Sequence, residues 1–229
     1  MAIKGKSRKQ LLKQPDEFLS FSRRLLAAVI QYKVYALSGL GVLLAAVLLA
    51  SGIHYFGNRA ENRAFALIEK GLAEYGKAFA EDGAQKAYQG ASKTFQSVLQ
   101  DYPGRDGGKV ARIIYAGMAY DAGDFDRAIT LYQEALKDAD AYPGLRPFLQ
   151  SGLGRAYDAK KEYALAAKQF EAVTRSPDPV LKEDAYLNLG FVYDRMGEAQ
   201  KSVETFKKFI SDYPDSAFLG MVKEKLASG

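Results

Sequence analysis

The sequence predicts an all-α protein: a single N-terminal transmembrane helix, then a solenoid of about four helical hairpins, then a C-terminal capping helix. Two observations lead to this fold class. A stretch without Asp, Glu, Lys or Arg, residues 34–58, separates a basic head from the rest of the chain. After it, one motif with an aromatic residue returns as Phe95, Tyr132, Phe170 and Phe206, at steps of 37, 38 and 36 residues, which is typical of stacked helical repeats. The expected parts are residues 1–33, 34–58 and 59–229.

Residues 1–33 are expected to form a basic cytoplasmic tail. They hold eight Lys and Arg residues against Asp16 and Glu17, a net charge of +6; the whole chain carries +5, which leaves −1 for everything after residue 33. The basic pI therefore belongs to the tail and does not indicate a nucleic-acid-binding surface. Apolar residues at three- and four-residue steps predict an amphipathic helix in the membrane interface: Phe18, Phe21, Leu25, Val29 and Tyr32. A role in topology alone explains the charges at least as well.

Residues 34–58 predict a transmembrane helix, because about 20 apolar residues are needed to cross roughly 30 Å of hydrocarbon. Tyr35 at one edge and Tyr55 at the other fit an aromatic belt, and the basic excess before the span puts the N-terminus in the cytoplasm. The alternatives are a cleaved signal peptide, whose apolar core would be only about 7–15 residues long, and a buried helix of a soluble protein. Small residues on one face predict close packing of a second membrane helix: Ser38, Gly41, Ala45 and Gly52.

Residues 59–229 are expected to repeat a helix, a tight turn and a second helix. Glycines at equivalent places in three first helices, Gly117, Gly154 and Gly190, are expected to let the paired helices approach. Gly123 and Gly197 are expected to end first helices, and Asp124 to cap the next one. A degenerate first unit covers about 62–103, and a final helix after Pro214 is expected to cover the open end with four apolar residues: Phe218, Met221, Val222 and Leu226.

These motifs resemble tetratricopeptide repeats. The pattern is carried by Leu189, Gly190, Tyr193, Gly197, Phe206 and Pro214, and again by Leu153, Gly154, Tyr157, Ala166 and Phe170. The chain departs from the pattern at Ser202, where alanine is usual, and at Phe209, where a small residue is usual. The resemblance implies a solenoid with a concave surface that binds proteins.

The residues predict no catalytic, cofactor or metal site, and no enzyme activity. The chain has no cysteine, which excludes a thiol nucleophile, and its one histidine, His54, excludes a histidine cluster. Asp121, Asp124 and Asp126 crowd one turn, but the loop lacks the glutamate that closes a calcium loop, so turn capping explains them better.

Matching the repeats predicts a partner-binding groove on the inner face of the solenoid. Its expected residues are Ile114, Met118, Asp121, Phe148, Arg155, Asp158, Leu187, Phe191, Asp194 and Arg195. Three of these are aspartates at equivalent positions late in a helix, where a negative charge opposes the helix dipole. They form an acidic edge for a basic segment, or ion pairs with Arg155, Arg195 or neighbouring lysines, or they are simply solvated.

The order of basic head, single span and helical repeats resembles the YfgM-like ancillary subunits of the SecYEG translocon. That resemblance implies a single-pass protein of the bacterial inner membrane with a periplasmic repeat domain. The implied partners are translocon subunits, a membrane-anchored periplasmic chaperone or secreted chains, together with membrane lipid and no nucleic acid. A second copy of the chain is a further candidate partner. The alternatives are a structural scaffold in cell-envelope assembly and a regulator whose cytoplasmic head docks a partner.

Overall fold

A computed structural model describes residues 33–142 and 144–228, without the side chains of residues 33–42, 53 and 141. The described residues form helices and turns and contain no strand. The chain divides into two units, Met1–Asn58 and Arg59–Gly229, which are described separately. The predicted basic tail and its interfacial helix, except for Lys33, lie outside the described residues.

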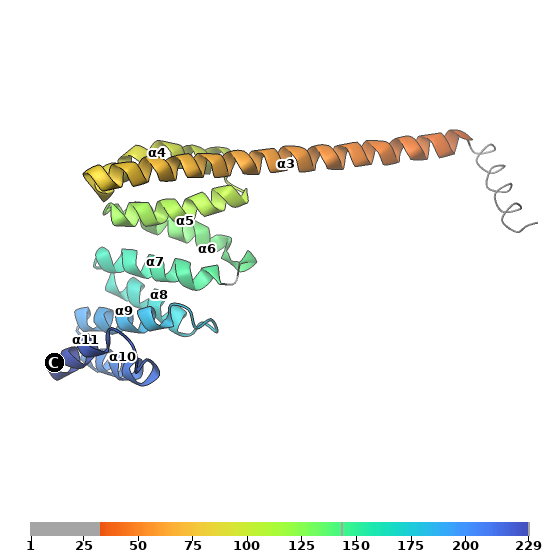
Figure 1. Cartoon of the computed structure of the whole chain (residues 1–229). Helices are drawn as coiled ribbons and strands as arrows, with labels where there is room; N and C mark the ends of the chain where they lie inside the picture. The colour runs from red at the N-terminus through yellow and green to blue at the C-terminus, as the bar shows by residue number, and fades with distance from the viewer. Residues whose placement is uncertain (1–32, 143, 229) are drawn as a thin grey trace, which may run out of the picture. The chain divides into compact units, whose positions relative to one another are not determined.

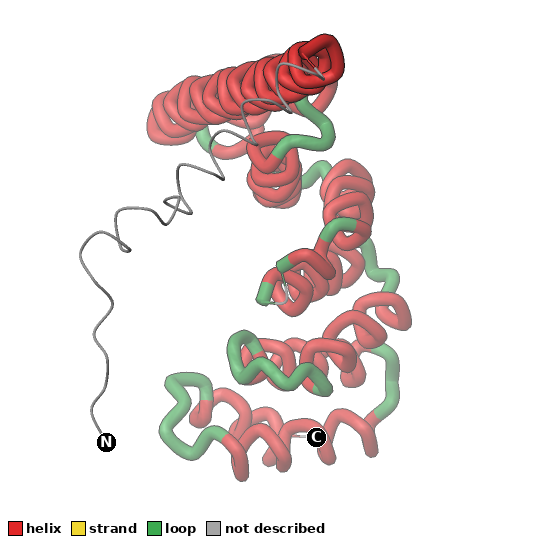
Figure 2. The backbone as a smooth tube through the Cα atoms, turned by 90° about the vertical axis from the view of Figure 1, so that its right-hand side faces the viewer, coloured by secondary structure: helices red, strands yellow, loops and turns green. Residues whose placement is uncertain are grey.

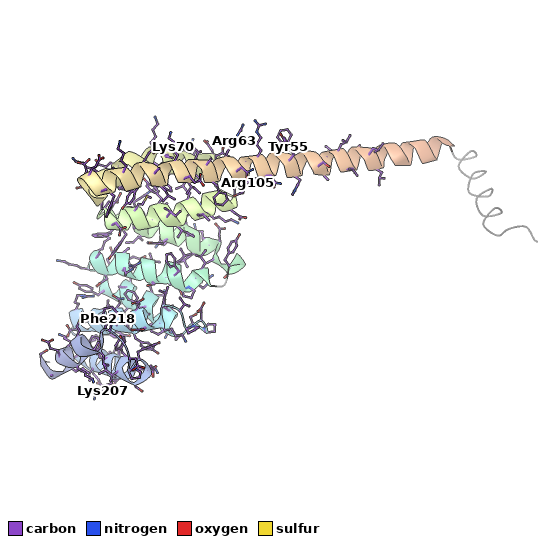
Figure 3. All side chains as sticks on the ribbon, viewed as in Figure 1. Tyr55, Arg63, Lys70, Arg105, Lys207 and Phe218 are labelled. Atoms are coloured by element: carbon purple, nitrogen blue, oxygen red, sulfur yellow. The ribbon has the colours of Figure 1, made fainter. Side chains whose placement is uncertain are left out.

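In the first unit, the described residues belong to helix α3 (Lys33–Asp82), which also contains the start of the second unit. Leu43, Leu48 and Tyr55 expose more than half of their surface, and Figure 3 marks Tyr55 among the side chains of α3. Among the helices that the structure describes, none combines the length and apolar character that crossing a membrane requires. The side chains of Ser38 and Gly41 lie outside the described residues, whereas a Cβ at Gly52 would meet nothing within 4 Å.

The second unit stacks helical hairpins one after another, as Figures 1 and 2 show. After α3 come α4 (Ala84–Asp101), α5 (Asp106–Asp121), α6 (Phe125–Lys137), the 3-10 turn η1 (Ala139–Ala141), α7 (Leu145–Ala159), α8 (Tyr163–Thr174), α9 (Lys182–Arg195), α10 (Ala199–Asp212) and α11 (Leu219–Ser228). Here α3, α5, α7 and α9 are the first helices of successive hairpins. This arrangement confirms the predicted all-α repeat solenoid.

The hairpin turns follow from single residues. The Asp124 carboxylate accepts a hydrogen bond from the Arg127 backbone N–H at 3.2 Å and so caps α6 as predicted. Gly123 and Gly197 adopt φ values of +82° and +75°, the left-handed conformation that glycine tolerates best. The equivalent turn between α7 and α8 uses Lys161 at φ +62°, a strained choice for a residue with a side chain.

The paired helices meet where a ring of the second helix lies against a glycine of the first. A Cβ added at Gly154 would lie 2.9 Å from two ring atoms of Phe170, and one at Gly190 would lie 2.7 Å from two ring atoms of Phe206. Both glycines therefore act as predicted. Gly117 does not, because the nearest atom to a Cβ there would be the Tyr132 hydroxyl at 3.9 Å. The Tyr132 ring lies instead against Gly152 of the next hairpin.

A separate apolar cluster closes the C-terminal end: Leu187, Phe206, Phe209 and Val222. Phe209, fully buried, fills the space that a small residue would leave between α10 and α11. The Ser202 hydroxyl donates to the Gly190 carbonyl at 2.9 Å, which satisfies this buried polar group. The expectation that Phe218 and Met221 cover the end was wrong, because they are 42% and 44% exposed (Phe218 is labelled in Figure 3).

Candidate functional site

The predicted groove residues lie on the first helices at matching positions. With the glycine of each helix as reference, Arg155 and Phe191 directly follow Gly154 and Gly190, and Phe148 precedes Gly154 by six residues. We call this surface the first-helix face. Phe148 and Arg155 are exposed on it, while Phe191 and Ile114 are half-buried.

Two of the predicted groove residues belong to the core instead. Met118 is 5% exposed and packs in the main apolar cluster, and Leu187 is 7% exposed and packs with Phe206 and Phe209. Matching the repeats placed them on the correct helices, but the sequence does not show how far neighbouring side chains cover a position. These two residues are therefore removed from the exposed part of the face.

Two of the three aspartates of the face form ion pairs, one with a neighbouring first helix and one with the final helix. Asp158 of α7 pairs with Arg195 of α9 at 2.7 Å, and Asp194 of α9 pairs with Lys225 of α11 at 2.8 Å. For these two residues the structure therefore supports ion pairing within the chain rather than an acidic edge that is free for a partner. Asp121 is exposed and forms no ion pair within the described residues.

Arg155 forms a further link between first helices. Its guanidinium lies 5.5 Å from the centroid of the Tyr120 ring on α5, a cation–π contact. Next to it, a small pocket of about 170 Å³ opens between α7 and α9. The pocket brings two predicted residues, Phe148 and Arg155, together with Asp184 and Asn188, which were not predicted. The face therefore offers both an aromatic surface and polar side chains at this point.

An apolar part of the face was missed, on α3. Gly71 lies against Phe95 as Gly154 lies against Phe170, which makes Leu72 the equivalent of Arg155 and Phe65 the equivalent of Phe148. Phe65, Leu72 and Phe79 are 41%, 42% and 50% exposed. These residues fall within the degenerate first unit predicted at about 62–103, and none of them was among the predicted groove residues. Their seven-residue spacing and the glycine before Leu72 are signals that could have placed them on the face.

A tyrosine hydroxyl lies at the junction of the apolar and charged parts. The Tyr75 hydroxyl of α3 is buried and has no hydrogen-bond partner among the described residues. Burial raises the pKa of Tyr75, and the nearby negative charge of Asp121 raises it further. Asp121 of α5 therefore lies near Tyr75 of α3 on this surface.

Asp124 and Asp126, next to the groove residue Asp121, form structural contacts. Within the described part of the chain, no group of three or more His, Cys, Asp or Glu side chains has the arrangement to hold a metal ion. Asp124 accepts a hydrogen bond from the Tyr88 hydroxyl at 2.9 Å besides capping α6, and Asp126 pairs with Lys160 at 2.5 Å. Turn capping and ion pairing thus explain Asp124 and Asp126, two of the three aspartates that had suggested calcium.

Comparison with known families and structures agrees with this geometry. Two tetratricopeptide repeat family models match the chain, one over residues 68–146 and 116–179 and the other over residues 184–216. No curated protein matches the sequence.

Two solved structures with a similar fold come from Podosopora anserina and are described as a kinesin light chain with nearly identical TPR-like repeats, the first being a single-residue variant of the second. The variant is 16% identical to this chain, with a TM-score of 0.54, and the match covers 69% of this chain and 77% of that one. The other is 17% identical, with a TM-score of 0.52, and covers 68% and 77%. At such low identity the likeness concerns the fold.

Proposed function

Because this chain belongs to the tetratricopeptide repeat proteins, it is a protein–protein interaction module, and we propose that the first-helix face of α3, α5, α7 and α9 binds its partner. The exposure of large apolar side chains on this face carries the proposal. Phe65, Leu72, Phe79 and Phe148 each leave more than two-fifths of their surface exposed. Contiguous apolar patches on folded proteins mark interaction sites, and Phe65, Leu72 and Phe79 follow one another at seven-residue steps along α3.

The charges of the face indicate what its partner presents. Asp158 and Asp194 are already paired, and Arg155 stacks on Tyr120, so the charged part contributes selectivity more than affinity. The apolar part on α3 accepts apolar side chains of a partner segment. A partner with apolar residues along one side and a basic residue near Asp121 therefore complements this surface.

We also propose that residues 34–58 anchor the chain in a membrane, with the repeat domain on the non-cytoplasmic side. The absence of charge from Val34 to Asn58 and the basic residues before it support this placement. Together with the resemblance to YfgM-like subunits, this favours an accessory of the Sec translocon and of periplasmic chaperones in a bacterial inner membrane. The step from fold to these partners is an analogy of architecture.

A scaffold in cell-envelope assembly is the second candidate function. One observation favours it: α11 and the turn before it leave Met221 and Phe218 exposed at the C-terminal end, where a further chain can pack. A scaffold would join proteins through this end as well as through the first-helix face. A translocon accessory needs only the face.

Photo-crosslinking in native membranes tests the proposed function. A photo-reactive residue replaces Leu72 or Phe148 on the first-helix face, and Leu165 of α8, 42% exposed, serves as a control of matched exposure. Adducts identified by mass spectrometry are expected at the first two positions and not at the control. Translocon subunits, chaperones or secreted chains in the adducts support the accessory function, and envelope-assembly proteins support the scaffold. Equal adducts at all three positions contradict the assignment of the face.

A further inference from the structure

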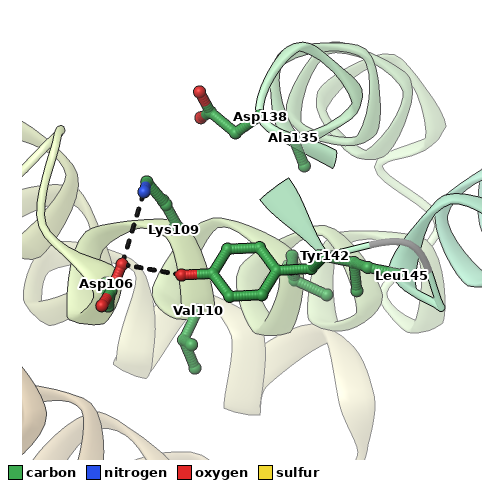
Figure 4. A pocket seen from close by; sticks show the side chains of 8 residues that line it. Asp106, Lys109, Val110, Ala135, Asp138, Tyr142 and Leu145 are labelled. Carbon is green, nitrogen blue, oxygen red and sulfur yellow. Dashed lines mark hydrogen bonds and ion pairs between the residues drawn. The ribbon is translucent and has the colours of Figure 1, made fainter. Parts of the chain in front are cut away.

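An apolar pocket lies apart from the predicted groove residues, where α5, the end of α6 and the start of α7 meet (Figure 4). Its volume is about 410 Å³. Val110 and Ile113 of α5, Ala135 of α6 and Leu145 of α7 form its walls, and Tyr142 of the connecting segment lies beside them. None of the ten predicted groove residues lines it. Ligand pockets in proteins begin at about 300 Å³, so this one can hold a substantial apolar group.

The charged groups at the rim of the pocket are already paired. The Tyr142 hydroxyl donates to the Asp106 carboxylate at 3.0 Å, and the Lys109 ammonium donates to the same carboxylate at 3.3 Å (dashed in Figure 4). These two hydrogen bonds lower the pKa of Asp106. Asp138 pairs with Arg112 at 3.4 Å. A charged ligand would therefore have to compete with existing partners.

Among the residues that the structure describes, the rim offers no unpaired charge to a charged ligand. Each carboxylate that lines the pocket faces a cation, Asp106 facing Lys109 and Asp138 facing Arg112. An anionic ligand such as a fatty acid would add repulsion from Asp106 and Asp138 without finding a cation that is not already paired. A neutral apolar group meets no such repulsion and covers the exposed surface of Val110 (37%) and Tyr142 (46%).

We propose that this pocket receives a neutral aromatic or branched aliphatic side chain of a partner polypeptide, as an anchor separate from the first-helix face. This inference rests on the proposed function, because the side chain that occupies the pocket belongs to a protein partner. Single apolar side chains that fill such pockets contribute a large share of binding energy in protein interfaces. The pocket would then select partners with an apolar residue that has no acidic neighbour.

Disulfide exchange with small probes tests the pocket directly. The chain has no cysteine, so Val110→Cys places a single thiol at the pocket. The full-length variant is equilibrated in detergent with a mixture of disulfides that carry an indole, isobutyl, ammonium or carboxylate group, under mild reduction. Val203→Cys on α10 is the matched control, because Val203 is also a valine with 37% exposure and does not line the pocket. Mass spectrometry measures the ratio of apolar to charged adducts.

The expected result is an apolar-to-charged ratio about tenfold higher in Val110→Cys than in Val203→Cys, equivalent to about 1.4 kcal/mol. Detergent affects both variants alike. Equal ratios in the two variants, or a preference for the carboxylate probe at position 110, overturn the proposal. In a second variant, Ala135→Leu added to Val110→Cys is expected to fill the pocket and remove the enrichment. Circular dichroism checks that this double variant folds. If it does not fold, the comparison of Val110→Cys with Val203→Cys still tests the proposal.

The two experiments fail independently. If the enrichment at position 110 is missing while crosslinks form at Leu72 and Phe148, the proposed role of the pocket is refuted and the proposed function stands. If the enrichment is present while no specific crosslinks form on the face, the pocket binds apolar groups but the face is not the partner surface.

Discussion

The same substitution, glycine to alanine, is predicted to have opposite effects at two equivalent positions of this solenoid. Gly117 and Gly190 both occupy the interior of a first helix, at the same place in the repeat. Alanine is favoured over glycine in a helix interior by about 1 kcal/mol. The sign of the total effect therefore depends on what the added methyl group meets.

At Gly190 the methyl group meets the core. Its carbon would lie 2.7 Å from two ring atoms of Phe206, which is only 1% exposed and has no space to move into. Overpacking of this kind costs typically about 1–3 kcal/mol. Taking the upper part of that range and subtracting the helix preference gives a predicted loss of about 2 kcal/mol for Gly190→Ala.

At Gly117 the methyl group meets almost nothing. The nearest atom, the Tyr132 hydroxyl, lies at 3.9 Å, an ordinary van der Waals distance. Gly117→Ala is therefore predicted to stabilise the protein by up to about 1 kcal/mol.

Urea unfolding of the two variants, followed by far-UV circular dichroism, measures both effects in the same assay. Comparison of the midpoints at an unchanged slope gives the change in stability. A Gly190→Ala variant as stable as the original, or a Gly117→Ala variant less stable by about 1 kcal/mol, would refute the reasoning from the glycine–ring contacts.

The remaining predictions concern a turn, a hydrogen bond and pH. Lys161→Gly should raise the free energy of unfolding by about 1 kcal/mol, because glycine removes the strain of a side chain in the left-handed conformation. Gly197→Ala should lower it by about as much through backbone strain alone, since a Cβ there meets nothing within 4 Å. Urea midpoints equal to that of the original protein would contradict both. Ser202→Ala should cost about 1 kcal/mol, because the buried hydrogen bond to the Gly190 carbonyl is lost, and urea unfolding checks it. Burial, and then the hydrogen bond to Glu171, raise the pKa of Tyr193 above its unfolded value, so the folded protein keeps a proton that the unfolded chain loses. The stabilisation that Tyr193 contributes is fully present below about pH 10 and is lost as the pH rises further. Tyr193→Phe should therefore make the decrease in unfolding free energy shallower when unfolding is measured from about pH 9 to 11.

The sequence alone was sufficient for the repeat architecture. Gly154 and Gly190 with their partner rings, and the glycines of the turns, each have a local meaning that the spacing exposes. Asp124 as a helix cap could also be predicted, since capping involves a residue only three positions away.

The candidate site could be predicted only in part. Phe148 and Arg155 line one small pocket together, because seven residues make about two turns of the same helix, α7. Met118 and Leu187 were misplaced, and Phe65, Leu72 and Phe79 were missed, because exposure depends on the neighbouring helix. The pairing of Asp158 with Arg195 was one of three alternatives that the sequence left open.

The sequence by itself determined which segments are helical, how they repeat and which residues turn the chain, because these properties follow from contacts between residues close in the chain. Only the tertiary structure decided which positions of the repeat are covered, which charges are paired and where a pocket remains. Tyr132 shows the reason, because its ring packs against Gly152 of the next hairpin and not against Gly117 of its own hairpin. Side chains from different repeats compete for the same space, and spacing along the sequence does not reveal the outcome of that competition.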